Sequence, residues 1–123
     1  MYTDDYGRAW EGPFPFTAAS IAANAPRLFG VYEVLYAFEE SLVVGYIGIA
    51  TGDSIFGRLS KHVSQKGNWA LGRLSDVSQW SFVYYRCDPT SAAQIESFVV
   101  TNAKPPFNVR SELKNLIPSI AVH

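Results

Sequence analysis

Two neighbouring stretches dense in apolar residues predict a β-hairpin in the first half of the chain. The first covers residues 30–38 and is rich in valine and aromatic residues, which strands favour. The second runs from Leu42 to Ile49. Only Glu39-Glu40-Ser41 separates them, so we expect a turn and an antiparallel strand pair. Four side chains would share one face of the first strand: Tyr32, Val34, Tyr36 and Phe38.

Helical spacing of apolar residues appears in two later stretches, with a third strand between them. The first helix would begin after Asp53 or Ser54 and run to about Gln65. Residues 80–86 read as the strand, and the second helix would be capped by Asp88 with Pro89 in its first position. The buried stripes of the two helices would be Ile55, Leu59 and Val63, then Ala92, Ile95 and Val99.

The ends of the chain predict less regular structure. Residues 11–16 contain two prolines and cannot lie inside a helix. Thr17 is a suitable N-cap for a short alanine-rich helix that ends before Pro26, and Ser111 for another before Pro118. The order strand, strand, helix, strand, helix predicts an α+β fold, a small three-stranded antiparallel sheet flanked by helices.

Composition is that of one globular domain. The 123 residues are 48% hydrophobic and 17% charged. The single Cys87 excludes an internal disulfide and a cysteine-based zinc site, so a cytoplasmic setting is the default expectation. Residues 1–10 do not resemble a signal peptide, and no apolar run approaches the roughly 20 residues of a membrane span.

Charge is unevenly distributed along a chain whose net charge is −1. Residues 1–40 carry six acids and two bases, whereas residues 41–123 carry eight bases and five acids. Residues 57–73 hold four cations and no acid: Arg58, Lys61, Lys66 and Arg73. That modest positive field suits either a nucleic-acid backbone or an ordinary solvated helix face.

Candidate chemistry begins with the two tripeptides Gly30-Val31-Tyr32 and Tyr46-Ile47-Gly48. Each places a tyrosine hydroxyl, which needs a partner when buried, close to a glycine that permits close approach. Four further polar residues stand out: Arg58 and His62 one helical turn apart, Glu96 as the only acid in an apolar helix, and Asn108 after two prolines. Each of the four also has an ordinary structural explanation when taken alone.

Together these residues resemble the GIY-YIG nuclease family, over about residues 27–110. The two tripeptides match the motif, with Val31 in place of isoleucine. The later family landmarks follow in order: Arg58, with His62 one turn later, Glu96 and Asn108. The resemblance implies a GIY-YIG-like α/β sandwich and divides the chain into an N-terminal extension (1–29), a nuclease-like domain (30–110) and a C-terminal helix and tail (111–123).

The resemblance further implies metal-dependent hydrolysis of phosphodiester bonds in DNA. Glu96 would hold one Mg²⁺ or Mn²⁺ ion, and Arg58 would stabilise the phosphate. Tyr32 would act as general base, with its pKa lowered by nearby cations, or would pass a proton onward. Tyr46 would assist it, His62 would relay a proton or bind phosphate, and Asn108 would hold the site in shape. Lys61, Lys66 and Arg73 would bind the substrate.

Three functional hypotheses remain at this point. The first is the endonuclease, for which the acidic net charge suggests that a partner protein or homodimer delivers the nucleic acid. The second is a nucleic-acid-binding module that keeps the fold without useful turnover. The third is an interaction protein whose partner covers an aromatic surface, since 15% of the residues are aromatic.

Overall fold

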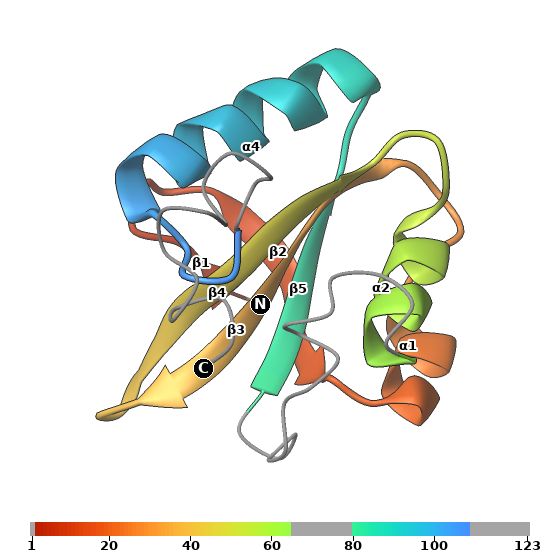
Figure 1. The fold of residues 1–123 in the computed structure, drawn as a ribbon, viewed down its shortest axis with the longest axis horizontal. Helices are drawn as coiled ribbons and strands as arrows, with labels where there is room; N and C mark the ends of the chain where they lie inside the picture. The colour runs from red at the N-terminus through yellow and green to blue at the C-terminus, as the bar shows by residue number, and fades with distance from the viewer. Residues whose placement is uncertain (1, 65–79, 109–123) are drawn as a thin grey trace, which may run out of the picture.

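The computed structural model describes residues 2–64 and 80–108, which form one twisted antiparallel sheet with helices on both faces (Figure 1). The strand order is β1-β2-β5-β3-β4. In chain order the elements are β1 (Tyr2–Thr3), β2 (Ala9–Pro15), α1 (Ala18–Asn24), β3 (Gly30–Phe38), β4 (Ser41–Ala50), α2 (Ile55–Val63), β5 (Trp80–Arg86) and α4 (Pro89–Ala103).

The elements expected from local pattern are present, and their caps are the expected residues. The side chains of Thr17, Ser54 and Asp88 each accept a hydrogen bond from the backbone N–H three residues later. Strands β3 and β4 pair as an antiparallel hairpin through a two-residue turn. Glu39 and Glu40 form that turn with positive φ angles of 48° and 66°, and Ser41 belongs to β4. The expected helix after Ser111 lies outside the described residues.

The sheet has five strands where the sequence predicts three. The proline-containing segment that the sequence only excludes from a helix forms most of β2. This strand pairs with β5 between Glu11 and Pro15. Its prolines are tolerated because the register shifts between Glu11 and Phe14 and because β1 pairs only with Ala9 and Trp10. Beyond that pairing, β2 behaves as an edge strand. The boundary expected after residue 29 stays a prediction, but strand pairing continues across it.

Two apolar clusters lie on opposite faces of the sheet. On one face, Tyr32 and Val34 of β3 pack with Ile21 of α1 and with Ile55 and Leu59 of α2. The other face is covered by α4, whose three inward side chains are the predicted ones, Ala92, Ile95 and Val99. Trp10 of β2 is completely buried in this second cluster. Strand β3 is therefore covered on both faces, which explains its continuous burial over residues 30–35.

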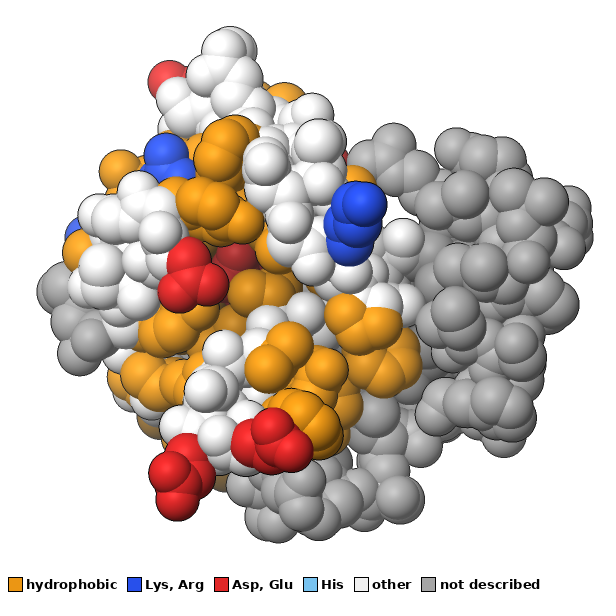
Figure 2. Space-filling view, turned by 90° about the vertical axis from the view of Figure 1, so that its left-hand side faces the viewer, with side chains coloured by type: hydrophobic (Ala, Val, Ile, Leu, Met, Phe, Trp, Pro, Cys, Tyr) orange, Lys and Arg blue, Asp and Glu red, His pale blue; other side chains and the backbone are white. Residues whose placement is uncertain are grey.

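Figure 2 looks onto the side where the free end of the β3–β4 hairpin and the C-terminal end of α4 lie. Hydrophobic side chains occupy much of the described surface there. Phe38 and Leu42 at the hairpin end are 57% and 40% exposed. Among the described residues, none of the helices has the length and apolar character needed to cross a membrane.

Candidate active site

A β-bulge in β4 brings the two motif tyrosines to the same face of the sheet. Val34 pairs with Tyr46 whereas Leu35 pairs with Val44, so Gly45 is an extra residue without a partner in β3. In a regular ladder Tyr46 would pair with Glu33 and point to the opposite face. With the bulge, Tyr46 shares the face of Tyr32, and their ring centroids are 6.2 Å apart.

The two motif glycines are required by close approach of other atoms. Tyr32 pairs with Gly48 across the hairpin, and a Cβ on Gly48 would overlap the Tyr32 hydroxyl. A Cβ on Gly30 would overlap the backbone carbonyl of Tyr85 in β5. The absence of side chains thus lets the hydroxyl end of Tyr32 approach β4 and lets β3 meet β5 closely.

Tyr32 and His62 form a buried hydrogen-bonded pair. The Tyr32 hydroxyl lies 2.7 Å from Nε2 of His62, and their side chains are fully and almost fully buried. Burial, and then the positive charge of Arg58, lowers the pKa of His62 to about 4. At neutral pH the imidazole is therefore uncharged and has one ring nitrogen able to accept a proton. The face shared by Arg58 and His62 thus points into the site.

Both tyrosine hydroxyls stay protonated in this environment. Burial raises the pKa of Tyr32 and of Tyr46, and this effect exceeds the lowering by the adjacent Arg58. The expectation that nearby cations lower the pKa of Tyr32 is therefore not met by Arg58 alone. These residues fit a role in which Tyr32 releases its hydroxyl proton while it accepts another. They fit a persistently deprotonated Tyr32 less well.

Arg58 carries a buried donor that has no partner. It lies in the middle of α2, beside both tyrosines, whose proximity raises its pKa despite its own desolvation. Within the described part of the chain, its Nε–H is buried and makes no hydrogen bond. An unsatisfied buried donor costs about 1–3 kcal/mol, which suits a site that receives an anionic acceptor.

Glu96 reaches the site from the other side of the β4 edge. It is half-buried on α4, and its charge is among the causes that raise the pKa of Tyr46. No group of three His, Cys, Asp or Glu side chains able to hold a metal ion occurs among residues 2–64 and 80–108. A single carboxylate near neutral hydroxyls fits Mg²⁺ or Mn²⁺, which commonly keep water and substrate oxygens as their remaining ligands.

Asn108 holds the second tripeptide from outside the sheet. Its Oδ1 accepts from Ile47 N at 2.8 Å, and its Nδ2 donates to Ile47 O at 2.7 Å. The preceding residue continues this pairing, since Phe107 N donates to the carbonyl of Gly45, the bulge residue. This segment therefore occupies the free edge of β4 and holds the bulge that orients Tyr46.

The expected substrate-binding cations are only partly described. Lys61 forms a solvent-exposed ion pair with Asp53 at 2.8 Å. The acid-free window of residues 57–73 misses Asp53, which lies directly before the N-cap Ser54 and still reaches Lys61. Lys66 and Arg73 lie outside the described residues. Their role in substrate binding stays a prediction.

Sequence reasoning missed Gly45, which controls the direction of Tyr46. A glycine inside an otherwise apolar strand is a signal for a bulge, and that signal was present in the sequence. This signal does not indicate on which side of the glycine the extra residue lies. The sheet face to which Tyr46 points is therefore known only from the structure.

Comparison with known proteins identifies the fold. No family model matches the sequence, and no curated protein matches it. Solved structures of the GIY-YIG N-terminal endonuclease domain of UvrC from Thermotoga maritima do match. Two tyrosine-to-phenylalanine mutants, each bound to its catalytic divalent cation, are 21% and 22% identical, with TM-scores of 0.50, over 70% of this chain and 88% of theirs.

An asparagine-to-alanine mutant of the same domain, also bound to its divalent cation, gives a TM-score of 0.54 at 19% identity over 76% of this chain and 96% of that one. The class defined by fold and site is thus an α+β domain with paired tyrosines, an arginine and a glutamate around one strand edge. Its fold is that of the GIY-YIG endonuclease domain, as the sequence resemblance implies.

Proposed function

We propose that this chain is a metal-dependent endonuclease that hydrolyses phosphodiester bonds in DNA. The observation that carries the proposal is the buried, unpartnered Nε–H of Arg58 beside the Tyr32–His62 pair. A phosphate oxygen would satisfy this donor, and the guanidinium charge would stabilise the negative charge that builds up in the transition state. The shared fold with a UvrC endonuclease domain supports the same assignment.

The hydrogen-bonded pair supplies a path for a proton. In the His62 tautomer whose Nε2 carries no proton, Tyr32 donates its hydroxyl proton toward Nε2, which leaves lone pairs on the tyrosine oxygen to accept a proton from water. A bound phosphate would offset the charge of Arg58, which is one cause of the low His62 pKa. Binding of substrate would therefore make His62 a better acceptor. Tyr46 would orient the same water or phosphate.

Glu96 would hold one divalent ion, Mg²⁺ or Mn²⁺, together with phosphate oxygens and water. When bound, the ion would neutralise charge on the phosphate and favour ionisation of water. A single protein carboxylate implies weak binding of the metal without substrate. Asn108 would act through Ile47 by fixing β4 and hence Tyr46. A cytoplasmic location and delivery of substrate by a partner protein or a second copy stay predictions.

The Glu96→Ala variant tests the proposal. We expect it to lose metal-dependent cleavage while it keeps the fold, because Glu96 is half-buried and lies outside the stripe of α4 that packs on the sheet. Cleavage of supercoiled, single-stranded and branched DNA, and of RNA, is measured with and without Mn²⁺. Glu11→Ala, an exposed acid on β2, is the matched control. Undiminished cleavage by a folded Glu96→Ala protein would contradict the assignment.

A further inference from the structure

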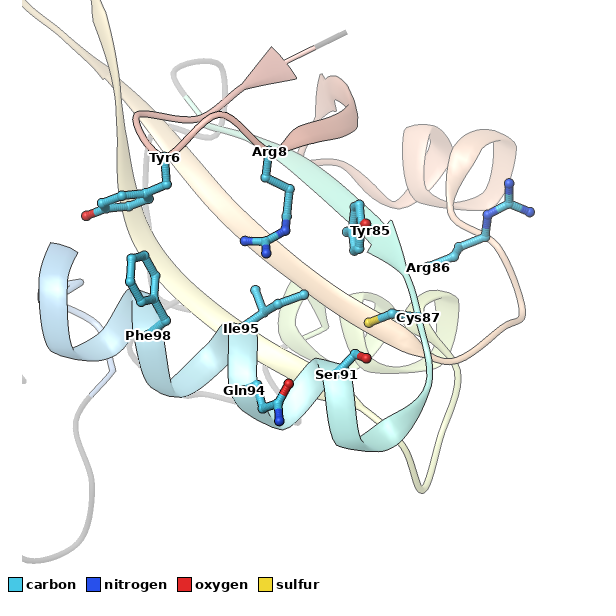
Figure 3. A pocket seen from close by; sticks show the side chains of 9 residues that line it. All are labelled: Tyr6, Arg8, Tyr85, Arg86, Cys87, Ser91, Gln94, Ile95 and Phe98. Carbon is cyan, nitrogen blue, oxygen red and sulfur yellow. The ribbon is translucent and has the colours of Figure 1, made fainter.

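A groove of about 460 Å³ lies between α4, the end of β5 and the turn that joins β1 to β2 (Figure 3). Its size is within the range of small-molecule sites. Tyr6 and Arg8 enter it from the turn, Tyr85 from β5, and Ile95 and Phe98 from α4. Ser91, Gln94 and Cys87 add polar atoms along one side. The proposed active site uses none of these side chains.

Arg8 provides a positive charge inside this groove. Its guanidinium points into the groove and lies 5.5 Å from the centroid of the Tyr85 ring. Among the described residues the one ion pair is between Lys61 and Asp53, so no acid neutralises Arg8 directly. A cation that rests on an aromatic ring at a groove wall suits an anionic ligand with a flat ring.

Neither Asp4 nor Glu33 forms an ion pair with Arg8. Asp4 uses its carboxylate to accept hydrogen bonds from the backbone N–H groups of Tyr6 and Arg8 and from the indole of Trp10. Glu33 is buried below, where burial and then Asp4 raise its pKa to about 8. Glu33 is therefore mostly protonated at pH 7.

Exposed aromatic rings form the open end of the groove. Tyr6 and Phe98 are 45% and 44% exposed and contact each other edge to face, with centroids 4.8 Å apart. Large exposed rings beside an arginine without an ion-pair partner are features with which proteins stack and hold unpaired bases. In a double helix the bases are already stacked on each other and would not reach these rings.

The groove and Glu96 lie on opposite flanks of α4. At about 100° per residue, Gln94 and Phe98 are each roughly 200° around the helix from Glu96. A nucleic-acid strand that occupies both sites would therefore have to pass around α4.

We propose that this groove binds an unpaired nucleotide of the DNA strand, with its phosphate on Arg8 and its base against Tyr6 and Phe98. The proposal rests on the endonuclease function and adds a recognition site to it. It also gives the slightly acidic chain a means of holding nucleic acid, which the net charge of −1 does not provide.

Binding is measured without divalent metal, so that no cleavage occurs, by fluorescence anisotropy of a labelled oligothymidylate and of a duplex of equal length. We expect the single strand to bind more tightly than the duplex. Arg8→Gln and Phe98→Ala should each weaken single-strand binding by about tenfold, in line with the stacking and charge contributions of such contacts. Lys104→Gln removes the same charge just beyond the C-terminal end of α4 and should leave binding within about twofold.

Cys87 gives a second, local measurement because it is the sole cysteine and lines the groove. Oligothymidylate should slow its alkylation by iodoacetamide in the unmodified chain but not in Arg8→Gln, with circular dichroism confirming that each variant is folded. If Arg8→Gln bound the single strand as tightly as the unmodified chain, or if the oligonucleotide did not slow alkylation, nucleotide binding in the groove would be contradicted. Neither result affects the cleavage test with Glu96→Ala. Conversely, the binding test can be read even if the chain does not cleave DNA, because it is done without metal.

Discussion

Burial, more than the neighbouring charges, determines the protonation of the ionisable residues around β3. It keeps Tyr32 protonated, His62 uncharged and Glu33 mostly protonated at neutral pH. Tyr32 and Glu33 are adjacent in the sequence but point to opposite faces, so one serves the proposed active site and the other lies under the Arg8 groove. The sequence indicates that Tyr32 is special, whereas nothing in it distinguishes Glu33 from an exposed acid.

Glu33→Gln should change how stability depends on pH. The folded-state pKa of Glu33 is raised from 4.5 to about 8, so folding favours the protonated acid. Its stabilising effect is complete below pH 4.5, is lost progressively as pH rises, and is gone above pH 8. The variant should therefore be more stable than the parent by roughly 3 kcal/mol at pH 7 and nearly equal near pH 4. Urea denaturation across this range measures the difference, and Glu11→Gln is an exposed control.

A parent chain whose stability did not decrease from pH 5 to pH 8 relative to Glu33→Gln would contradict this account of Glu33. His62, whose pKa is lowered to about 4, loses its stabilising effect as pH falls from 6.5. That effect is shared by both proteins, so the difference between them isolates Glu33.

Arg58→Ala should reduce cleavage much more than it affects folding. Loss of one preorganised donor to a developing oxyanion costs about 10²–10³ in rate. The same change removes the buried Nε–H that has no partner together with the guanidinium contacts to Tyr32 and Tyr46, so the change in stability should be small. Single-turnover cleavage and thermal unfolding measure the two effects. Arg27→Ala removes an arginine that stacks on Phe56 of α2, 3.9 Å from the ring centroid, and is the matched control. A loss of rate equal in both variants would argue against a specific role for Arg58.

Local signals predict the elements well because each signal acts within one turn or one strand. The caps at Thr17, Ser54 and Asp88 and the hairpin at residues 30–50 were all readable from the sequence. Gly45 signals a bulge in the sequence, but the contact that holds the edge of β4 has no such local signal, because Asn108 lies 61 residues from Ile47. The direction of Tyr46 is thus a long-range property of the edge of β4.

Asn108→Ala should loosen this edge. The substitution removes two hydrogen bonds to Ile47, each worth about 0.5–1.5 kcal/mol, so we expect a loss of roughly 1–3 kcal/mol. Cleavage should fall as well, because Tyr46 is no longer held on the Tyr32 face. Hydrogen exchange of the Ile47 amide reports the loss directly.

Asn102→Ala is the control for this substitution, since it removes one exposed asparagine bond to a helix carbonyl. It should change neither amide exchange at Ile47 nor cleavage. If Asn108→Ala kept full protection of the Ile47 amide, the bulge would be held by β3 alone.

At the scale of the whole molecule, residues 2–15 complete the sheet instead of preceding it. Strand β2 covers the outer edge of β5, and Trp10 fills the second apolar cluster with no exposed surface. The prolines that exclude a helix here hid this strand, because proline is depleted in central strands. The groove of Arg8 forms where the turn between β1 and β2 reaches α4, with Tyr6 against Phe98.

Trp10→Ala tests whether residues 1–29 are a separable extension or part of the domain. A buried tryptophan truncated to alanine costs about 3–5 kcal/mol, and here Asp4 also loses the indole donor. We therefore expect a large loss of stability in one cooperative urea transition that includes the signal of the β3–β4 hairpin. Phe38→Ala removes a ring that is 57% exposed at the hairpin end and should cost far less. Comparable stability of the two variants would mean that the N-terminal strands dock on a domain that folds without them.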